Sequence, residues 1–259
     1  MTTSKSMLLT DRKRIVIKLG GSMLEGLQSG FFTKFHEMKS AGYEIVIVHG
    51  GGPSINTALQ KNAIASNIDN GIRVTCDQSI AIVRDVLIGE VNPSLVHQLN
   101  REGIDAIGLS GFDGKLLTCT LLNKERYGFV GDIQHVNDRL LEKLLAAGIV
   151  PVVSCIGATE CGKPLNINAD TVASKVALAI GAASLLFVTD TPGIKIGNEI
   201  QSTVSPSDIA NWIEAGDIYG GMIPKVNAAI DCLDAGVPSV QIADQHLAGT
   251  TIGVEEVFI

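Results

Sequence analysis

The chain has 259 residues, of which 46% are hydrophobic and 18% are charged, and its formal net charge is −7. This composition is that of a globular protein and excludes a disordered chain. A negative net charge argues against a nucleic-acid surface, because such surfaces are usually basic. A small anionic ligand needs only a local positive pocket and is therefore not excluded.

Targeting signals and disulfides are not indicated by the sequence. Residues 1–10 are polar and lack the apolar segment of a signal peptide. The longest apolar run, residues 176–188, is too short to cross a bilayer. The five cysteines are odd in number and lack zinc-type spacing, and Cys155 could pair with Cys161 only through a turn. We therefore expect a cytoplasmic protein that does not contact membranes and has reduced, mostly buried thiols.

Two apolar strand segments near the start of the chain end in glycine-rich turns. Residues 15–17 lead into Lys18, Gly20 and Gly21, and residues 45–48 lead into three glycines. Glycines let the backbone approach a ligand closely, and a helix N-terminus behind them favours an anion. Two readings without a ligand stay open: a lysine that reaches solvent at a strand end, and a tight strand-to-helix connection.

The middle of the chain alternates between strand and helix patterns. The turn at Asn70 and Gly71 predicts a hairpin that carries Arg73 on its far side. Residues 75–78 match a capping box, and Pro93 is expected to bend or restart the helix that follows. Repeated strand, helix, strand order predicts an α/β fold: a three-layer αβα arrangement around a mostly parallel open central sheet. Further strands are expected at residues 104–109, 149–155, 185–188 and 237–242, and residues 116–122 and 129–136 have a weaker β pattern.

Two helix starts in the second half carry residues of interest. Asn168 is a suitable N-cap, and Asp170 in the first turn is either a ligand contact or simply a carboxylate that suits the helix dipole. Lys225 lies in the first turn of the last long helix, where a cation opposes the dipole by about 0.3–1 kcal/mol. A lysine at such a position indicates an anion site.

Two common nucleotide signatures are absent. The pattern G-x-x-x-x-G-K-[ST] fails because Leu116 follows Lys115, and G-x-G-x-x-G fails because Ile55 occupies the last glycine position. The remaining lysines and glycine turns suit phosphoryl transfer, which requires positioning and charge neutralisation. No histidine stands out as a base, but a carboxylate acceptor is already a nucleophile at pH 7 and needs none.

The ordered motifs at residues 18–21, 49–53, 71–75, 166–170 and 221–226 resemble those of the acetylglutamate kinases, within the amino acid kinase family. The resemblance implies ATP-dependent phosphorylation of the side-chain carboxylate of N-acetyl-L-glutamate, giving N-acetyl-L-glutamyl 5-phosphate in arginine biosynthesis. It implies ATP and Mg²⁺ as cofactors. It also implies two lobes: residues 1–170 for the acyl substrate and dimerisation, and residues 171–259 for ATP.

The resemblance also assigns roles to individual residues. Lys18 and Lys225 stabilise the transferring phosphoryl group, and Asp170 holds these lysines in place. Backbone amides of Gly51 and Gly52 cradle the substrate and the phosphoryl group. No protein ligand to a metal is implied.

Further roles concern the two substrates. Arg73 and Asn166 bind the α-carboxylate, which suits a bidentate arginine. Phe112 departs from the pattern, since relatives often carry lysine there, and this affects only a peripheral contact. The segments that resemble nucleotide-binding segments contribute Gly20, Gly21, Asp190, Thr191, Pro192, Gly193, Ile194, Lys195, Asp217, Ile218 and Tyr219.

Two alternatives to this function remain. A related kinase that acts on another acyl group, such as carrier-bound aminoadipate, would differ in the pocket around Arg73. A non-catalytic ligand sensor of the same fold would be expected to lack Lys18, Lys225 or Asp170. A nicotinamide dehydrogenase is disfavoured by the failed dinucleotide pattern.

The segment before the first strand carries an expectation about assembly. Arginine-sensitive relatives have an additional N-terminal helix that links dimers into a ring. Residues 1–14 are too short and too polar for such a helix pair, because isolated helices shorter than about 12–15 residues are marginal. We therefore expect a homodimer that is insensitive to arginine.

Overall fold

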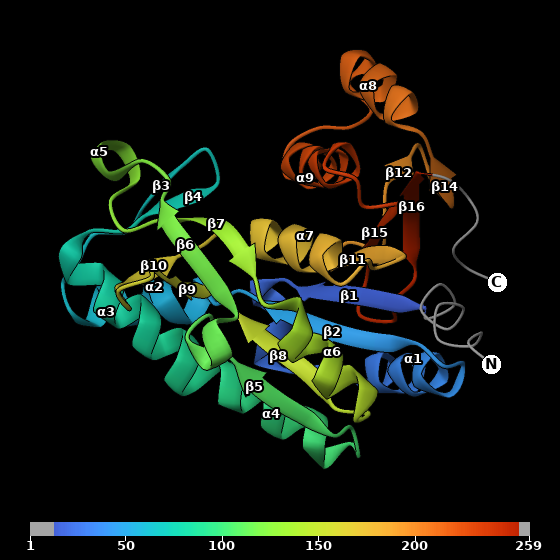
Figure 1. Cartoon of the computed structure of the whole chain (residues 1–259). Helices are drawn as coiled ribbons and strands as arrows, with labels where there is room; N and C mark the ends of the chain where they lie inside the picture. Colours follow the sequence, from blue (N-terminus) through green and yellow to red (C-terminus); the bar gives the residue numbers. More distant parts are fainter. Residues whose placement is uncertain (1–12, 254–259) are drawn as a thin grey trace, which may run out of the picture.

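The computed structural model describes residues 13–253, so the expectation for the N-terminal segment lies mostly outside the described residues. An eight-stranded sheet runs through the centre of the molecule (Figure 1). Its strands are β1 (Arg14–Leu19), β2 (Glu44–His49), β5 (Ala106–Leu109), β8 (Val150–Ser154), β11 (Ser184–Val188), β14 (Thr203–Val204), β15 (Ser239–Ala243) and β16 (Gly249–Gly253).

The strand order in this sheet is β14-β16-β15-β11-β1-β2-β8-β5. Every neighbouring pair is parallel except β15 and β16. The predicted mostly parallel sheet is thus confirmed. The first strand of the chain lies inside the sheet, between β2 and β11.

Helices cover both faces of this sheet, which makes the predicted three layers. Along β1 the side chains alternate: Ile15 and Ile17 join the core under α1 and α4, whereas Val16 joins the core under α6, α7 and α9. Because both faces are buried, residues 15–17 of the strand are all apolar and do not alternate with polar residues, while Arg14 and Lys18 lie toward its two ends. The helices are α1 (Ser29–Ser40), α2 (Gly52–Lys61), α3 (Asp77–Val86), α4 (Asn92–Arg101), α5 (Lys124–Tyr127), α6 (Asp138–Ala146), α7 (Ala169–Ala179), α8 (Pro206–Ala215) and α9 (Met222–Asp234).

Smaller sheets lie outside the central sheet. The predicted hairpin forms between β3 (Asn67–Asp69) and β4 (Ile72–Val74), with Asn70 and Gly71 at positive φ in its turn. A second sheet has the order β10-β9-β6-β7. The strands outside the central sheet that complete the fold are β6 (Leu117–Leu121), β7 (Gly131–Val136), β9 (Ile156–Ala158), β10 (Pro164–Asn166), β12 (Lys195–Ile196) and β13 (Glu199–Ile200).

The long helical segment after the hairpin differs from its prediction at the start. The capping box over residues 75–78 does not form: the Thr75 hydroxyl accepts from Asn166 instead of from the helix, and Cys76 is the N-cap, without a side-chain hydrogen bond. Further along, a π-helical turn, η2 (Leu87–Val91), separates α3 from α4. Pro93 lies in the first turn of α4, so the predicted restart of the helix is confirmed.

The cysteines are all free thiols, as expected, and three of the five are buried. Burial raises the pKa of Cys119 to about 12 and that of Cys232 to about 11, which keeps both thiols protonated. Within residues 13–253, no helix combines the length and the hydropathy that a bilayer crossing requires.

Candidate active site

A cavity of about 220 Å³ opens at the carboxyl ends of the central strands β1 and β11. In open α/β sheets this edge is where ligands bind. The cavity draws its walls from both halves of the chain. It is lined by Lys18, Gly20, Gly21, Asp170, Phe187, Thr189, Asp190, Lys225 and Ala228.

Lys18 is fixed on one side of this cavity by an ion pair. Its Nζ lies 2.8 Å from Oδ1 of Asp170 and 5.8 Å from the centre of the Phe187 ring. Asp170 is held in the first turn of α7, where Asn168 caps the helix by accepting hydrogen bonds from the backbone N–H groups of Asp170 and Thr171. The predicted N-cap is therefore confirmed, and it places the carboxylate against the lysine.

Lys225 enters the same cavity from the first turn of α9. Its Nζ lies 3.1 Å from Oδ1 of Asp190 and also donates to the hydroxyls of Thr189 and Thr191. The hydrogen bond from Lys225, and then its charge, lowers the pKa of the Asp190 carboxyl. The structure thus brings Asp170 to Lys18 and gives Lys225 a different partner, Asp190, whereas the sequence assigned both lysines to Asp170.

The two glycine-rich turns meet beside this cavity. The Gly20 amide donates to the Val188 carbonyl at 3.0 Å, which ties the first turn to β11. A Cβ built on Gly21 would lie 2.7 Å from Cδ of Pro53, so only glycine lets the loops approach this closely. By contrast, a Cβ at Gly52 would have no neighbour within 4 Å among the described residues. That space beside the backbone of Gly52 is available to a ligand.

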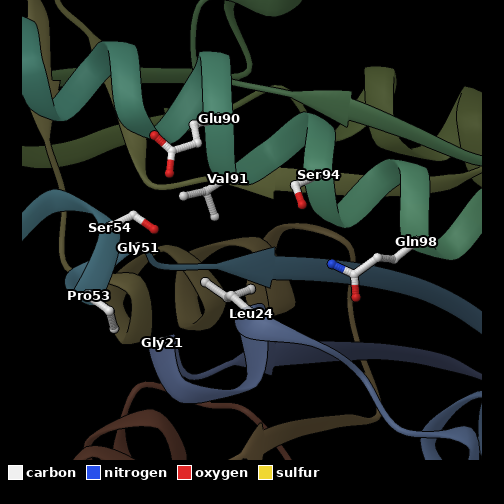
Figure 2. Close-up of a pocket in the computed structure, with 9 residues that line it drawn as sticks. All are labelled: Gly21, Leu24, Gly51, Pro53, Ser54, Glu90, Val91, Ser94 and Gln98. Carbon is white, nitrogen blue, oxygen red and sulfur yellow. The ribbon is translucent and has the colours of Figure 1, made fainter. Parts of the chain in front are cut away.

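Figure 2 shows a second cavity, also of about 220 Å³, between these loops and the long helical segment. The side chain of Val91 points toward the loop at Gly51 (Figure 2). A Cβ at Gly51 would lie 2.6 Å from Leu87 and 3.5 Å from Val91. Gly51 therefore has the π-helical turn packed directly against it, while Gly52 faces open space.

The residues predicted to bind a carboxylate lie on and beside the hairpin. Asn166 donates to the Thr75 hydroxyl at 3.0 Å, and that hydroxyl donates to the Arg73 carbonyl at 2.9 Å, so Thr75 links the two residues. Arg73 also donates to the Ser66 hydroxyl, and partial burial lowers the pKa of its guanidinium. At the turn, the Asn168 amide donates to the Gly71 carbonyl at 3.4 Å.

A larger cavity, of about 700 Å³, lies between the hairpin turn and helices α7 and α9. It is lined by residues 70–72 of the turn and by residues of α7 and α9. Asp170 and Ala228 line both cavities. A ligand that spans from the hairpin to the two lysines would therefore pass Asp170.

The predicted nucleotide-binding residues divide into two groups. Gly20, Gly21 and Asp190 line the lysine cavity, and Thr191 reaches it through its hydrogen bond with Lys225. The remaining residues do not line this cavity: Ile194 and Ile218 are buried in the core, and the Tyr219 side chain is 76% exposed. The others in this second group are Pro192, Gly193, Lys195 and Asp217.

Sequence reasoning missed two residues of the cavity. Thr189 precedes Asp190 in the polar turn after β11, and its position beside a predicted site residue is a usable signal. Phe187 is apolar in an apolar strand, so its place below the Lys18 ammonium leaves no signal in the sequence. Within the described part of the chain, no group of three or more histidine, cysteine, aspartate or glutamate side chains is arranged to hold a metal ion.

The comparisons with known proteins agree with this geometry. The family model described as "Amino acid kinase family" matches residues 13–244. The acetylglutamate kinase of Geobacillus kaustophilus is 45% identical over 230 residues, which covers 89% of each chain. That of Halalkalibacterium halodurans is 41% identical, over 92% of this chain and 95% of its own. Among solved structures, smu.665 from Streptococcus mutans UA159 superposes with a TM-score of 0.83 at 33% identity, over 93% of this chain and 98% of that one.

Proposed function

We propose that this chain, which belongs to the amino acid kinase family, transfers the γ-phosphoryl group of ATP to the side-chain carboxylate of N-acetyl-L-glutamate. The near full-length likeness to acetylglutamate kinases supports this substrate. The observation that carries the proposal is the single cavity into which Lys18 and Lys225 both reach, beside two glycine-rich turns. The product would be N-acetyl-L-glutamyl 5-phosphate, an intermediate of arginine biosynthesis.

The two lysines would neutralise the charge that spreads over the phosphoryl oxygens as the bond to ATP breaks. In phosphoryl transfer this electrostatic stabilisation is the main task of the protein. Lys18 is held at its place by Asp170. Lys225 is bound to Asp190, a largely exposed carboxylate, so an incoming phosphate can replace this partner at small cost.

The acceptor carboxylate would attack the γ-phosphorus directly. One of its oxygens forms the new P–O bond, the bond from phosphorus to the β–γ bridging oxygen breaks, and ADP leaves with the electron pair. Because the acceptor is ionised at pH 7, no proton has to be removed and no general base is required. The amides of Gly51 and Gly52 would cradle the phosphoryl group, and the open space beside Gly52 supports this role.

Arg73 and Asn166 would bind the α-carboxylate of the acyl substrate. Thr75 links the two residues, and residues 70–72 of the same hairpin line the large cavity, which shares Asp170 with the lysine cavity. A guanidinium can bind a carboxylate through two parallel hydrogen bonds, which fixes both its distance and its direction.

ATP would lie on residues 171–259, with Mg²⁺ bound to its phosphates. The carboxylates of the lysine cavity, Asp170 and Asp190, are both paired with lysines. This fits a metal held mainly by phosphate oxygens, as is usual for Mg²⁺. The ion supplies additional neutralisation of phosphate charge. The protein would act in the cytoplasm, where ATP is available.

The proposed reaction predicts a specific substrate preference. With ATP and Mg²⁺, the purified protein should phosphorylate N-acetyl-L-glutamate and leave free L-glutamate nearly unused, because the pocket at the hairpin would receive an uncharged acylated nitrogen. Trapping the acyl phosphate with hydroxylamine measures the product directly. Equal turnover of both amino acids, or turnover only of another acyl carboxylate, would show that the assigned substrate is wrong.

We also propose that the protein assembles as a homodimer with twofold symmetry, the commonest arrangement among soluble oligomers. Strand β5 ends the central sheet, and its Ile107 side chain is 41% exposed, which leaves an apolar edge that a second copy could cover. Light scattering at micromolar concentration should give twice the 27.2 kDa chain mass. Ile107→Lys should shift the mass to that of a monomer; a monomeric wild type, or a hexamer, would contradict the proposal.

A further inference from the structure

His49 is fully buried at the end of β2, directly before the glycine turn. Its Nδ1 lies 2.7 Å from the Gly50 carbonyl oxygen, and its Nε2 lies 2.9 Å from Nδ2 of Asn92. Burial lowers the pKa of His49 to about 4, so the ring is neutral at neutral pH and carries one proton.

The surrounding groups decide which ring nitrogen holds that proton. Nδ2 of Asn92 also lies 2.9 Å from the Val152 carbonyl, which can only accept, so this atom is the amide nitrogen and a donor. Since Nδ2 can only donate, Nε2 of His49 must accept from it. The proton is therefore on Nδ1, from which it is donated to the Gly50 carbonyl.

This hydrogen bond fixes the direction of the next amide. The peptide bonds of the described chain are all trans, and in a trans peptide the C=O and the following N–H point in opposite directions. With the Gly50 carbonyl held toward the buried ring, the N–H of Gly51 points to the side away from it. The preceding peptide is held in the same way, because the Cys155 thiol donates to the His49 carbonyl at 2.9 Å.

Asn92 reaches the ring because of the π-helical turn that precedes it. The turn places Leu87 and Val91 against Gly51 and is followed at once by Asn92. Figure 2 shows Val91 beside this loop. Gly108 on β5 leaves room for this side chain, since a Cβ there would lie 1.9 Å from Oδ1 of Asn92. π-Helical turns of this kind occur frequently at functional sites.

We propose that His49 and Asn92 are positioning residues that aim the Gly51 amide at the transferring phosphoryl group. The inference rests on the proposed function, in which this amide belongs to the cradle. Neither side chain touches the substrate. Their effect is on the orientation of a backbone donor, so it should appear in kcat and not in substrate binding.

The test compares His49→Leu, which removes the donor, with His49→Asn, whose amide nitrogen can replace Nδ1. His49→Leu should lower kcat on the order of 10-fold to 10²-fold, with little change in either KM. The reason is that a displaced Gly51 N–H would weaken an interaction made mainly in the transition state. His49→Asn should recover most of kcat. Ser154→Ala is the matched control: Ser154 is an equally buried polar residue paired with His49 across β2 and β8, and its hydroxyl has no partner among the described residues.

Two results would overturn the inference: unchanged kcat in His49→Leu, or a loss of kcat that follows a lower melting temperature and is not recovered by His49→Asn. If His49→Leu does not fold, Asn92→Ala takes its place, with a smaller loss of kcat expected.

The ¹⁵N resonances of the His49 ring should report the Nδ1–H tautomer, and a ring protonated on Nε2 would contradict the inference. The Gly51 amide resonance should respond to a non-hydrolysable ATP analogue in wild type and not in His49→Leu. These spectra need no turnover, so they decide the inference even if N-acetyl-L-glutamate is not the substrate.

Discussion

Replacing Lys225 by alanine is expected to lower kcat by about 10²-fold or more and to leave both KM values almost unchanged. The reason is that the ammonium group would contact the phosphoryl oxygens most strongly when their charge is redistributed, in the transition state. In the structure it is bound to Asp190 and two threonine hydroxyls. Steady-state kinetics with ATP and the acyl substrate varied separately measures the effect.

Lys34→Ala is the control that shows whether losing a lysine ion pair outside the cavity changes the kinetics. Lys34 pairs with Glu37 at 3.0 Å on the exposed face of α1, away from the cavity, and kcat should not change. A Lys225→Ala enzyme with a raised KM for ATP and a normal kcat would show that Lys225 binds nucleotide equally in ground and transition states, and its assigned role would be wrong.

Arg73→Ala should act mainly on the KM for the acyl substrate, raising it by about 10-fold to 10²-fold, the usual range for losing hydrogen bonds to a charged group. The α-carboxylate does not take part in the reaction, so it would be bound alike in the ground and transition states. The KM for ATP should stay near its wild-type value. Initial rates over a range of acyl-substrate concentrations give both parameters.

An arginine that contacts the same hairpin offers a matched control. Arg126 of α5 pairs with Asp69 of β3 at 2.7 Å and is about half exposed, so Arg126→Ala removes an arginine that contacts the hairpin but has no predicted role in substrate binding. It should leave both KM values unchanged. An Arg73→Ala enzyme that lost only kcat would place this guanidinium at the phosphoryl group instead of the α-carboxylate.

The layers of the fold could be predicted because their signals are local. Ile15 and Val16 belong to a short run that is apolar at every position and is followed by glycines, a pattern typical of a strand with both faces covered. The turn at Asn70 and Gly71 requires positive φ, which the structure contains at both residues. The sequence also predicted that Lys18 lies at the end of a strand and Lys225 at the start of a helix. Lys225 was noticeable because a cation in the first turn of a helix opposes the helix dipole.

The contacts between these elements could not be predicted, because they depend on distances between segments far apart in the chain. Thr75 matches a helix cap, but its hydroxyl accepts a hydrogen bond from Asn166, 91 positions later in the chain. The pairing of Lys225 with Asp190 crosses 35 positions, and the contact of His49 with Asn92 crosses 43. No spacing rule covers such pairs. The π-helical turn that brings Asn92 to His49 likewise leaves no mark in the helical periodicity.

The central position of β1 has a consequence for the order in which the chain folds during synthesis. One edge of β1 pairs with β2, which follows soon after it, but the other edge waits for β11, more than 160 residues later. Until residues 184–188 have left the ribosome, an apolar strand edge with Ile15 and Ile17 stays open to other chains. The central sheet is thus incomplete until the last third of the chain has been synthesised. A strand formed by the first residues of the described chain depends, for one of its two edges, on a strand that emerges more than 160 residues later.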